Sequence, residues 1–436
     1  MKLNYKRTIL IGFAFMAILA FWELYDQIVP YVLHYKFEYN TVQTNIIMSI
    51  DNILALFMLP LFGKISDKTK TPLGKRTPYI LFGTIASVAA LCALAVVEGK
   101  QSKTGFIIVL MILLVAMSTY RSPAVAYMPD VTEKPLRSKG NAIINLVGYV
   151  GGIFTTVIMA LLAPGTINEE GDKVYSPDQS FSVVFFVVAA FMLISVIIMV
   201  LTVKENRILA ETNIHDDEPE ASRNGKTKLS KPVTLSLILI LVSVFFWWMS
   251  YNGVTTMFSR YCQEIWGVHP GESSGYKTIA MIAAIIAFVP LGLISNKIGR
   301  KKSVLFGIAL MTVCYTGAFF VQEKSVLMYI IFSVVGIGWA AINVNSFPMV
   351  VEMCTGSDVG KYTGYYYTFS MAAQIVTPLL SAVLIDNVFP QWNYKILFPY
   401  AVIFSVASFV TMCFVRHGDS KPETKSAIEE QFAADN

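Results

Sequence analysis

Long apolar runs are the feature of this sequence that most limits what it can fold into. Runs of about 20 residues recur along the 436-residue chain, and each is long enough to cross about 30 Å of hydrocarbon as a helix. Hydrophobic residues make up 55% of the chain and charged residues 14%. Apolar and polar residues do not alternate within the runs, which excludes the strands of a β-barrel. We expect an all-α membrane protein with twelve spans, at 8–33, 42–63, 78–97, 105–127, 140–163, 181–203, 233–259, 274–296, 303–321, 326–350, 362–384 and 394–415.

Basic residues are distributed unevenly between the two ends of the predicted spans. With a cytoplasmic N-terminus, about 25 of the 34 Lys and Arg residues fall on the cytoplasmic side, as the positive-inside rule requires. We therefore expect both termini in the cytoplasm and the protein in a cell (inner) membrane. The net charge of +5 follows from this asymmetry, so it does not indicate a nucleic-acid partner.

A polar stretch separates the first six predicted spans from the last six, and it has the composition of a solvated linker. We predict four segments: an N-terminal half (1–203), a cytoplasmic linker (204–232), a C-terminal half (233–416) and a cytoplasmic tail (417–436).

The two predicted halves resemble each other in sequence. FWELYDQIVPYVLHY at 21–35 aligns without gaps with WWMSYNGVTTMFSRY at 247–261. A G-x-x-x-[DN] motif, followed by a glycine and two basic residues, occurs after the second span and again after the eighth. The offsets are all about 220 to 230 residues, and duplication of a six-helix unit is their simplest cause.

The repeated loop motif has a physical rationale as a gate. A glycine lets two helix ends approach closely, an acid accepts from amides at a helix start, and basic residues hold the loop inside. A loop that only fixes the topology would have the same composition. The candidate gate residues are Gly63, Asp67, Gly74, Lys75, Arg76, Asp130 and Arg137 in the first half, and Gly292, Asn296, Gly299, Arg300 and Glu352 in the second.

Twelve spans, cytoplasmic ends, a central loop and this duplicated motif together resemble the major facilitator superfamily. The stretch SDKTKTPLGKRTPY and the segment from Tyr120 to Arg137 are similar to those of the sucrose:proton and glycoside-pentoside-hexuronide:cation symporters. The resemblance implies two pseudo-symmetric six-helix halves and a cavity lined by the first, fourth, seventh and tenth helices. It also implies that the loop after the second helix stabilises an outward-open state.

Four ionisable residues of the first half are expected at membrane depth: Glu23, Asp26, Asp51 and Arg121. A charge near the bilayer centre costs about 2.5 to 3.5 kcal/mol on insertion scales, so such residues usually face a cavity or a partner. Depth along the first helix favours Glu23, because Asp26 lies close to the outer edge of the hydrocarbon. Asp26 could instead be interfacial, Glu23 and Asp51 could make structural hydrogen bonds, and Arg121 could form a helix–helix ion pair or extend to the surface.

The second half has neutral residues at most of these positions. Met249, Asn252 and Asn343 align with Glu23, Asp26 and Arg121, respectively. A carboxylate in a medium of low dielectric constant holds a proton more readily than it does in water. We hypothesise that the four ionisable residues couple transport to a cation, most simply a proton, with sodium as the alternative.

Aromatic and polar side chains recur with helical spacing on the helices expected around the cavity. Sugars present polar edges and apolar faces, so their sites combine aromatic rings with hydrogen-bonding groups. Any single aromatic residue could instead pack or anchor at the interface. The candidate substrate-binding residues are Trp22, Tyr25, Asn141, Asn145, Tyr149, Trp248, Tyr251, Asn252, Trp339, Asn343, Tyr367 and Gln374.

The sequence contains no hydrolase triad, phosphate-binding loop or metal-ligand spacing, and its four histidines and five cysteines are scattered. We expect no enzyme activity, no metal and no cofactor beyond a coupling ion. The main hypothesis is a monomeric transporter, in contact with membrane lipid, that moves a sugar or glycoside together with a cation. Two alternatives are a proton-coupled exporter of amphipathic compounds and a membrane sensor or scaffold that transports nothing.

Overall fold

The computed structural model describes residues 3–162, 166–167, 173–174, 180–212, 229–267, 273–353 and 358–419. Twelve helices of 17 residues or more build the described part of the chain. They are α1 (Tyr5–Tyr31), α2 (Thr41–Lys68), α3 (Thr77–Gly99), α4 (Lys103–Asp130), α5 (Arg137–Leu162), α6 (Ser182–Thr202), α9 (Lys231–Trp266), α10 (Ser273–Ile298), α11 (Arg300–Phe319), α12 (Val326–Glu352), α13 (Val359–Val383) and α14 (Leu397–Cys413).

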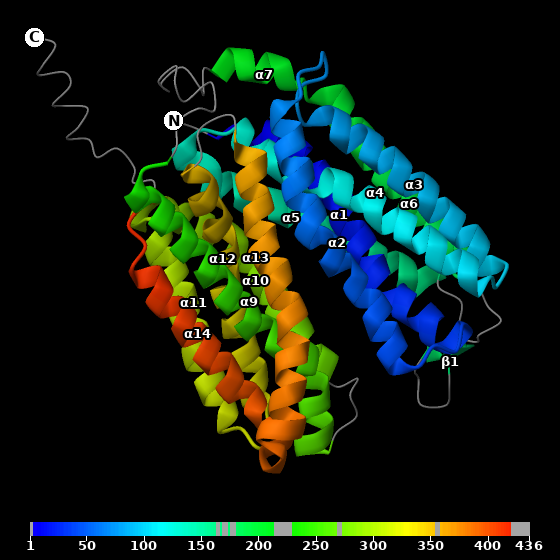
Figure 1. Cartoon of the computed structure of the whole chain (residues 1–436), viewed down its shortest axis with the longest axis vertical. Coiled ribbons are helices and arrows are strands. Elements are labelled where there is room, and N and C mark those ends of the chain that lie inside the picture. The colour runs from blue at the N-terminus through cyan, green and yellow to red at the C-terminus, as the bar shows by residue number, and fades with distance from the viewer. Residues whose placement is uncertain are drawn as a thin grey trace, which may run out of the picture.

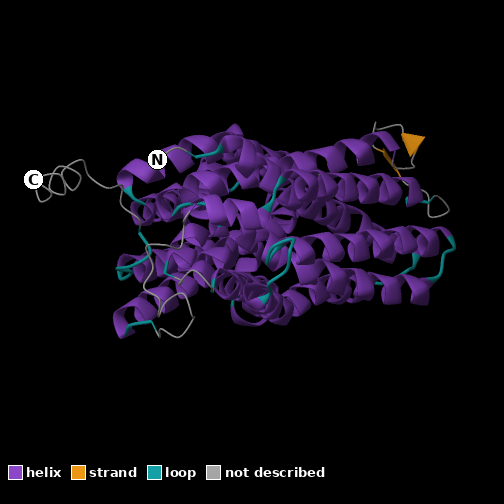
Figure 2. Ribbon diagram, turned by 90° about the horizontal axis from the view of Figure 1, so that it is seen from above, coloured by secondary structure: helices purple, strands orange, loops and turns teal. Residues whose placement is uncertain are grey.

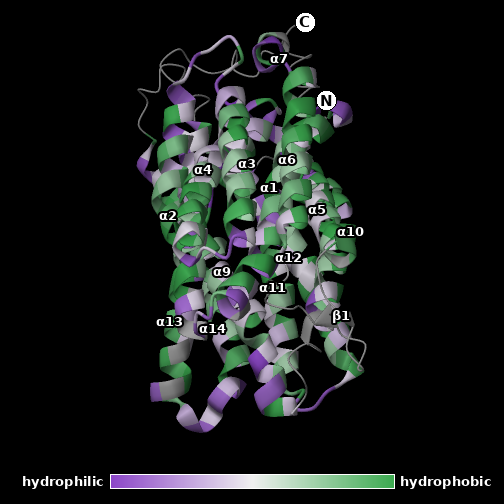
Figure 3. Cartoon of the chain, turned by 90° about the vertical axis from the view of Figure 1, so that its right-hand side faces the viewer, coloured by the Kyte–Doolittle hydropathy of each residue, from purple (hydrophilic) through white to green (hydrophobic). Residues whose placement is uncertain are grey.

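Most of these helices are apolar enough to cross a membrane. By length and composition, eleven segments of the described chain qualify as spans, and α13 is the long helix that does not. A polar face with Ser370, Gln374, Thr377 and Ser381 accounts for the lower hydropathy of α13. Many large apolar residues are exposed on the surface of the bundle. Figure 3 colours much of the helices green, for hydrophobic residues. The predicted all-α membrane fold is confirmed.

The helices form two halves, α1–α6 and α9–α14 (Figure 1). In the first half α1 packs on α5 and α6, and α3 packs on α4 and α6. In the second half α9 packs on α14, and α12 packs on α10 and α11. The halves meet at the end of the bundle that carries α7 and diverge toward the other end. We call these the closed end and the open end.

Two pairs of helices join the halves. α2 packs along α13, and α5 packs along α10 and, less extensively, α12. Each half thus contributes its second and fifth long helix, as expected for duplicated units related by a pseudo-twofold axis.

Short elements connect the long helices. A two-stranded antiparallel hairpin, β1 with β2, lies at the open end, where the sequence suggested no strand (Figure 2). α7 follows α6 at the closed end. The short elements are η1 (Val32–Lys36), η2 (Lys134–Leu136), β1 (Thr166–Ile167), β2 (Lys173–Val174), α7 (Glu205–Thr212), η4 (Leu384–Val388) and η5 (Pro390–Ile396).

Several helices extend beyond the apolar runs that predicted them. α2 continues to Lys68 and α9 to Trp266, because a helix ends at a cap rather than where its side chains become polar. Gly267 caps α9 in the left-handed conformation at φ 67°. Much of the predicted linker (213–228) and nearly all of the tail (420–436) lie outside the described residues.

The close packing of α1 on α5 gives a prediction about stability. A Cβ at Gly151 would lie 2.1 Å from the carbonyl oxygen of Met16, whereas at Gly152 its nearest atom would be 3.8 Å away, on Glu23. Gly151→Ala should force the two helices apart and cost about 1 to 3 kcal/mol. We expect a lower midpoint of thermal unfolding in detergent at a fixed heating rate. Gly152→Ala is the matched control, and equal midpoints for both variants would contradict the packing.

Candidate functional site

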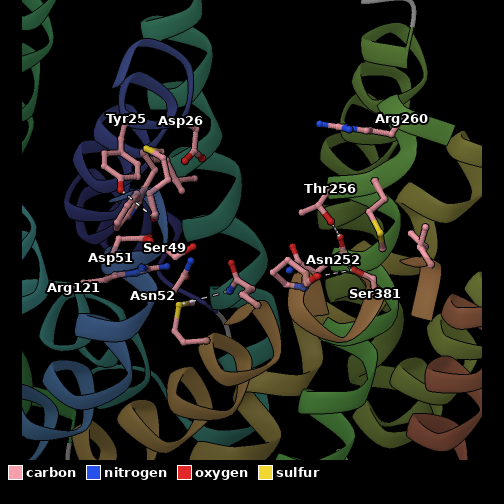
Figure 4. A pocket seen from close by; sticks show the side chains of 18 of the residues that line it. Tyr25, Asp26, Ser49, Asp51, Asn52, Arg121, Asn252, Thr256, Arg260 and Ser381 are labelled. Carbon is pink, nitrogen blue, oxygen red and sulfur yellow. Dashed lines mark hydrogen bonds between the residues drawn. The ribbon is translucent and has the colours of Figure 1, made fainter. Parts of the chain in front are cut away.

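A cavity of about 760 Å³ lies between the two halves. α1, α2 and α4 supply one wall, and α9, α13 and one residue each of η4 and η5 supply the other. Figure 4 shows the first half on the left and the second on the right. The polar lining residues are Tyr25, Asp26, Ser49, Asp51, Asn52 and Arg121 from the first half, and Asn252, Thr256, Arg260, Gln374, Ser381 and Tyr394 from the second.

Two acids lie on the first-half wall. Asp26 is exposed to the cavity and Asp51 is half-buried. Oδ1 of Asp51 accepts no hydrogen bond from any described residue. The neighbouring Tyr25 is buried and donates its hydroxyl to the carbonyl oxygen of Met48 at 3.3 Å. The first half therefore presents two carboxylates to the cavity.

Arg121 is held between aromatic rings of both halves. Its Cζ lies 5.0 Å from the ring centroid of Trp22 on α1 and 5.2 Å from that of Tyr367 on α13. Within the described chain, no carboxylate oxygen lies within 4.0 Å of its guanidinium nitrogens. Cation–π contacts therefore fix this side chain at the cavity wall. Arg121 therefore neither forms an ion pair between helices nor extends to the membrane surface, which were the two alternatives for this residue.

Glu23 does not line the large cavity. It lines a neighbouring pocket of about 270 Å³ between α1, α5 and α10, which shares Trp22 and Asp26 with the cavity. Its Oε1 accepts hydrogen bonds from Gln27 and, at 3.1 Å, from Thr156. Depth along α1 could not show this difference, because residues three apart on a helix point about 60° apart.

An aromatic cluster joins the halves beside the cavity. Tyr251 of α9 stacks on Trp339 of α12 with centroids 5.7 Å apart, and Trp248 packs edge-on against Tyr251. Tyr149 of α5 packs edge-on against Trp339 at 6.4 Å. Nε1 of Trp248 and Nε1 of Trp339 have no hydrogen-bond partner among the described residues. The cluster offers apolar faces together with unused N–H donors.

Two asparagines of α5 that were expected to bind substrate donate to backbone carbonyls instead, and one of them, Asn141, thereby joins the halves. Nδ2 of Asn141 donates to the carbonyl oxygens of Asn343 and Val344 on α12, each at 3.0 Å. Asn145 is also buried and donates to the carbonyl oxygen of Asn141 at 2.8 Å. Pro348 has no N–H to offer the carbonyl of Val344, so an amide from α5 fills that role.

At the closed end, Arg76 is the centre of a buried ionic network. Its Nε donates to Asp130 at 2.7 Å, and its other nitrogens donate to Asp67 and Ser66. Lys75 adds a second cation 3.0 Å from Asp130. Burial opposes the charge on Arg76, but Asp130 and Asp67 outweigh it and hold the pKa of the guanidinium above its usual value. Arg76 therefore stays charged.

Asp67 connects this network to the second half. It accepts from the backbone amides of Gly360 and Lys361, each at 2.8 Å, at the start of α13. A negative charge is favourable at a helix N-terminus. A Cβ on Gly63 would lie 2.1 Å from the carbonyl oxygen of Gly360, so this approach requires glycine.

The second copy of the loop also spans the halves, with different chemistry. Arg300 donates to Glu352 at 2.7 Å and to the carbonyl of Lys134 in the first half. Arg137 reaches across to the carbonyl oxygen of Val351 at 3.1 Å.

The asparagine of the second copy does not reproduce the contacts of Asp67. Gly292 faces Ala142, where an added Cβ would lie 2.9 Å from the Ala142 Cβ. Asn296 makes no side-chain hydrogen bond among the residues that the structure describes. Asp67 caps a helix of the other half, whereas Asn296, at the same position of the second copy, caps none among the described residues.

Two acids that the sequence analysis missed complete the loops. Glu205 accepts from the backbone amides of Lys75 (2.9 Å), Arg76 (3.1 Å) and Thr77 (3.0 Å), at the start of α3. Asp419 accepts from the amide of Arg300 at 2.7 Å, at the start of α11. Each is the first acid after the last span of its half, and this shared position is a usable signal.

A glycine in each loop leaves room for the carboxylate that caps the next helix. Gly74 has φ 112° and lies against Glu205, while Gly299 has φ 96° and lies against Asp419. An added Cβ would come within 2.1 Å and 2.8 Å of the two carboxylates, respectively.

Thr256 and Arg260 also line the cavity and were not predicted from the sequence. They follow Asn252 along one face of α9 at the i, i+4, i+8 spacing. No group of three His, Cys, Asp or Glu residues in the described chain could hold a metal ion.

Comparisons with known proteins agree with this geometry. A protein-family profile described as "MFS/sugar transport protein" matches residues 10–359. A search of curated protein sequences found no significant match.

Solved structures with this fold include the transporter FucP in the outward conformation (TM-score 0.73, 14% identity, 94% of this chain and 99% of that one). FucP is the E. coli fucose:proton symporter. A bacterial homologue of the iron transporter ferroportin has a TM-score of 0.71 at 12% identity (94% and 99% covered). The proton:xylose symporter XylE has a TM-score of 0.67 at 12% identity (95% and 95% covered). Because the family profile spans most of the chain, the protein belongs to the MFS/sugar transport family and is a multi-pass membrane transporter with the twelve-helix major facilitator fold.

Proposed function

We propose that this transporter carries a sugar or glycoside together with a cation by alternating access. The observation that carries the proposal is the composition of the central cavity. It combines Asp26, Asp51 and Arg121 with the amides of Asn52, Asn252 and Gln374, and aromatic rings stand beside them. Such a lining can hydrogen-bond the edges of a sugar and stack on its faces.

The charge of the cavity favours a neutral polar substrate. Two aspartates and two arginines line it, so their formal charges cancel when all are ionised. Structural neighbours include a human organic anion transporter as well as sugar symporters, so the fold alone leaves the substrate open. An organic anion would need excess positive charge, and an amphipathic compound would need a mainly apolar lining. The cavity offers neither.

The closed end faces the cytoplasm in this proposal. Most lysines and arginines of the sequence lie in loops on that side, which the positive-inside rule assigns to the cytoplasm. The open end then faces the outside of a cell (inner) membrane, and the described state is outward-open. Each chain encloses a whole cavity, which supports a monomer as the working unit. The two halves, 1–203 and 233–416, rock against each other around the substrate.

Cation coupling is assigned to the first-half wall. Asp26 and Asp51 are the acids of the large cavity, and Arg121 carries the nearby positive charge. Glu23 lines the neighbouring pocket and not the large cavity, so the proposal gives it no part in binding the cation. A proton is the simplest coupling ion because two neighbouring carboxylates resist simultaneous ionisation. Sodium is the alternative.

The coupling assignment predicts how two variants behave. Asp26→Asn and Asp51→Asn each remove a group that binds the cation. In proteoliposomes containing a pH-sensitive dye, addition of the transported sugar should acidify the lumen for the unsubstituted protein. We expect each variant to slow this acidification by about tenfold or more while exchange of labelled sugar persists.

Glu23→Gln is the control for this experiment, because Glu23 lies outside the large cavity. It should acidify the lumen at nearly the normal rate. Full acidification by Asp26→Asn and Asp51→Asn would refute proton coupling through these residues. A sugar panel repeated with a sodium gradient then separates sodium coupling from uncoupled transport.

Alternating access also predicts the effect of weakening the closed end. Asp67→Asn removes the charge that caps α13, and a hydrogen bond to a charged group contributes about 1.5 to 3 kcal/mol. A cysteine in place of Ser122, which is fully buried beside Gly63, should then react about tenfold faster with an impermeant maleimide added to inside-out vesicles. Asn296→Ala, in the second copy of the loop, is the matched control and should leave the rate unchanged. Equal rates in both variants would show that Asp67 does not hold the closed end.

A further inference from the structure

Arg260 is a cation of the cavity wall with no acid beside it. It is exposed and lies two turns beyond Asn252 on α9, toward the open end. No acid of the described chain lies within 4.0 Å of its guanidinium, Glu264 one turn further along included. Lys277 of α10 donates to the preceding residue, Ser259, at 3.1 Å. Among the described residues, neither Arg260 nor Lys277 has a carboxylate oxygen within 4.0 Å of its side-chain nitrogens.

The opposite wall offers an acid to Arg260. In Figure 4 the guanidinium of Arg260 points across the cavity toward the wall that carries Tyr25 and Asp26. The carboxylate of Asp26 is exposed to the same cavity. The charged groups that act on Asp26 are Glu23 from its own helix, Asp51 from α2 and Arg121 from α4. None of them comes from the second half.

Closure of the open end would bury the carboxylate of Asp26 and the guanidinium of Arg260, so each then needs a counter-ion. Alternating access brings the walls together at this end and removes water from between them. A buried ion without a counter-ion is far less favourable than a buried pair, so in the empty protein Arg260 must meet an acid in the closed arrangement. α2 runs inward from Thr41, which places Asp51 deeper in the cavity, whereas Asp26 lies near the open end of α1. Asp26 is therefore the acid in position.

We propose that Asp26 and Arg260 form an ion pair when the open end of the empty protein closes, and that this pair is the latch of that closed arrangement. The latch rests on the proposed function, because it supplies a reason for coupling. Asp26 cannot hold a proton and pair with Arg260 at the same time. An empty protein therefore closes after Asp26 has released its proton, and a protonated protein without substrate stays open. This rule prevents the leak of protons without sugar.

Distances between spin labels across the open end test the latch without any substrate. Lys100 and Glu323 are exposed in open-end loops, one in each half, and each is replaced by a labelled cysteine after the five native cysteines are removed. In lipid nanodiscs at alkaline pH, the otherwise unsubstituted protein should populate a short and a long distance. Arg260→Gln and Asp26→Asn should each lower the ratio of short to long distances by about tenfold or more.

Charge reversal separates a direct pair from two independent effects. The swap of Asp26→Arg with Arg260→Asp should restore the ratio to within about threefold of the unsubstituted protein. The double neutral variant, Asp26→Asn with Arg260→Gln, should be no more open than either single variant, because the pair is already lost. Lys277→Gln removes a nearby cation that lies outside the cavity lining, so it should leave the ratio unchanged.

Three results would overturn the latch. They are an unchanged ratio in Arg260→Gln, additive effects in the double neutral variant, and no short distance in the unsubstituted protein between pH 5 and 9.

The outcome of the distance measurement does not depend on the substrate, because no sugar is present. If the sugar panel fails while the latch variants behave as expected, only the substrate assignment falls. If sugar-driven acidification is intact and the latch variants have no effect, only the latch falls.

Discussion

The carboxylate of Asp67 is the contact on which the shape of the cavity depends. In its own half it binds Arg76, whose fully buried guanidinium is also held by Asp130. In the other half it caps α13 through two backbone amides. One carboxylate thus ties a buried ionic network to the start of a helix across the interface. With the halves joined at this end, the cavity opens at the other end.

The two halves share a frame but differ in charge, and this difference gives the cavity its chemistry. Aromatic residues of α1 recur in α9, where Trp248 and Tyr251 stand at the positions of Trp22 and Tyr25. The acids and Arg121 belong to the first half alone among the aligned positions. Two halves of the same fold can rock between an outward-open and an inward-open state. Because the acids lie in the first half, only that wall of the cavity can bind a cation.

Particular residues show where prediction from sequence succeeded and failed. The gate motifs could be recognised from the sequence because each combines glycines, an acid or amide, and two basic residues in a nearly fixed order. Asn141 and Asn145 were assigned to substrate from their helical spacing, yet Asn141 donates to backbone carbonyls of α12 and Asn145 donates to the carbonyl of Asn141. Spacing identifies a shared face but not the neighbour that covers it. Glu205 was missed because its partners are backbone amides of a loop about 130 residues away, which leave no trace in side-chain patterns.

The sequence by itself determined the membrane, the number of long helices and the duplicated halves, because hydrocarbon thickness and apolar run length are local quantities. Only the tertiary structure decided which ionisable side chains face one another. Glu23 and Asp26 differ by less than a turn of helix, yet Asp26 lines the large cavity and Glu23 a side pocket. Their directions depend on how α1 is rotated against α5 and α6, and that rotation is fixed by packing between distant segments of the chain.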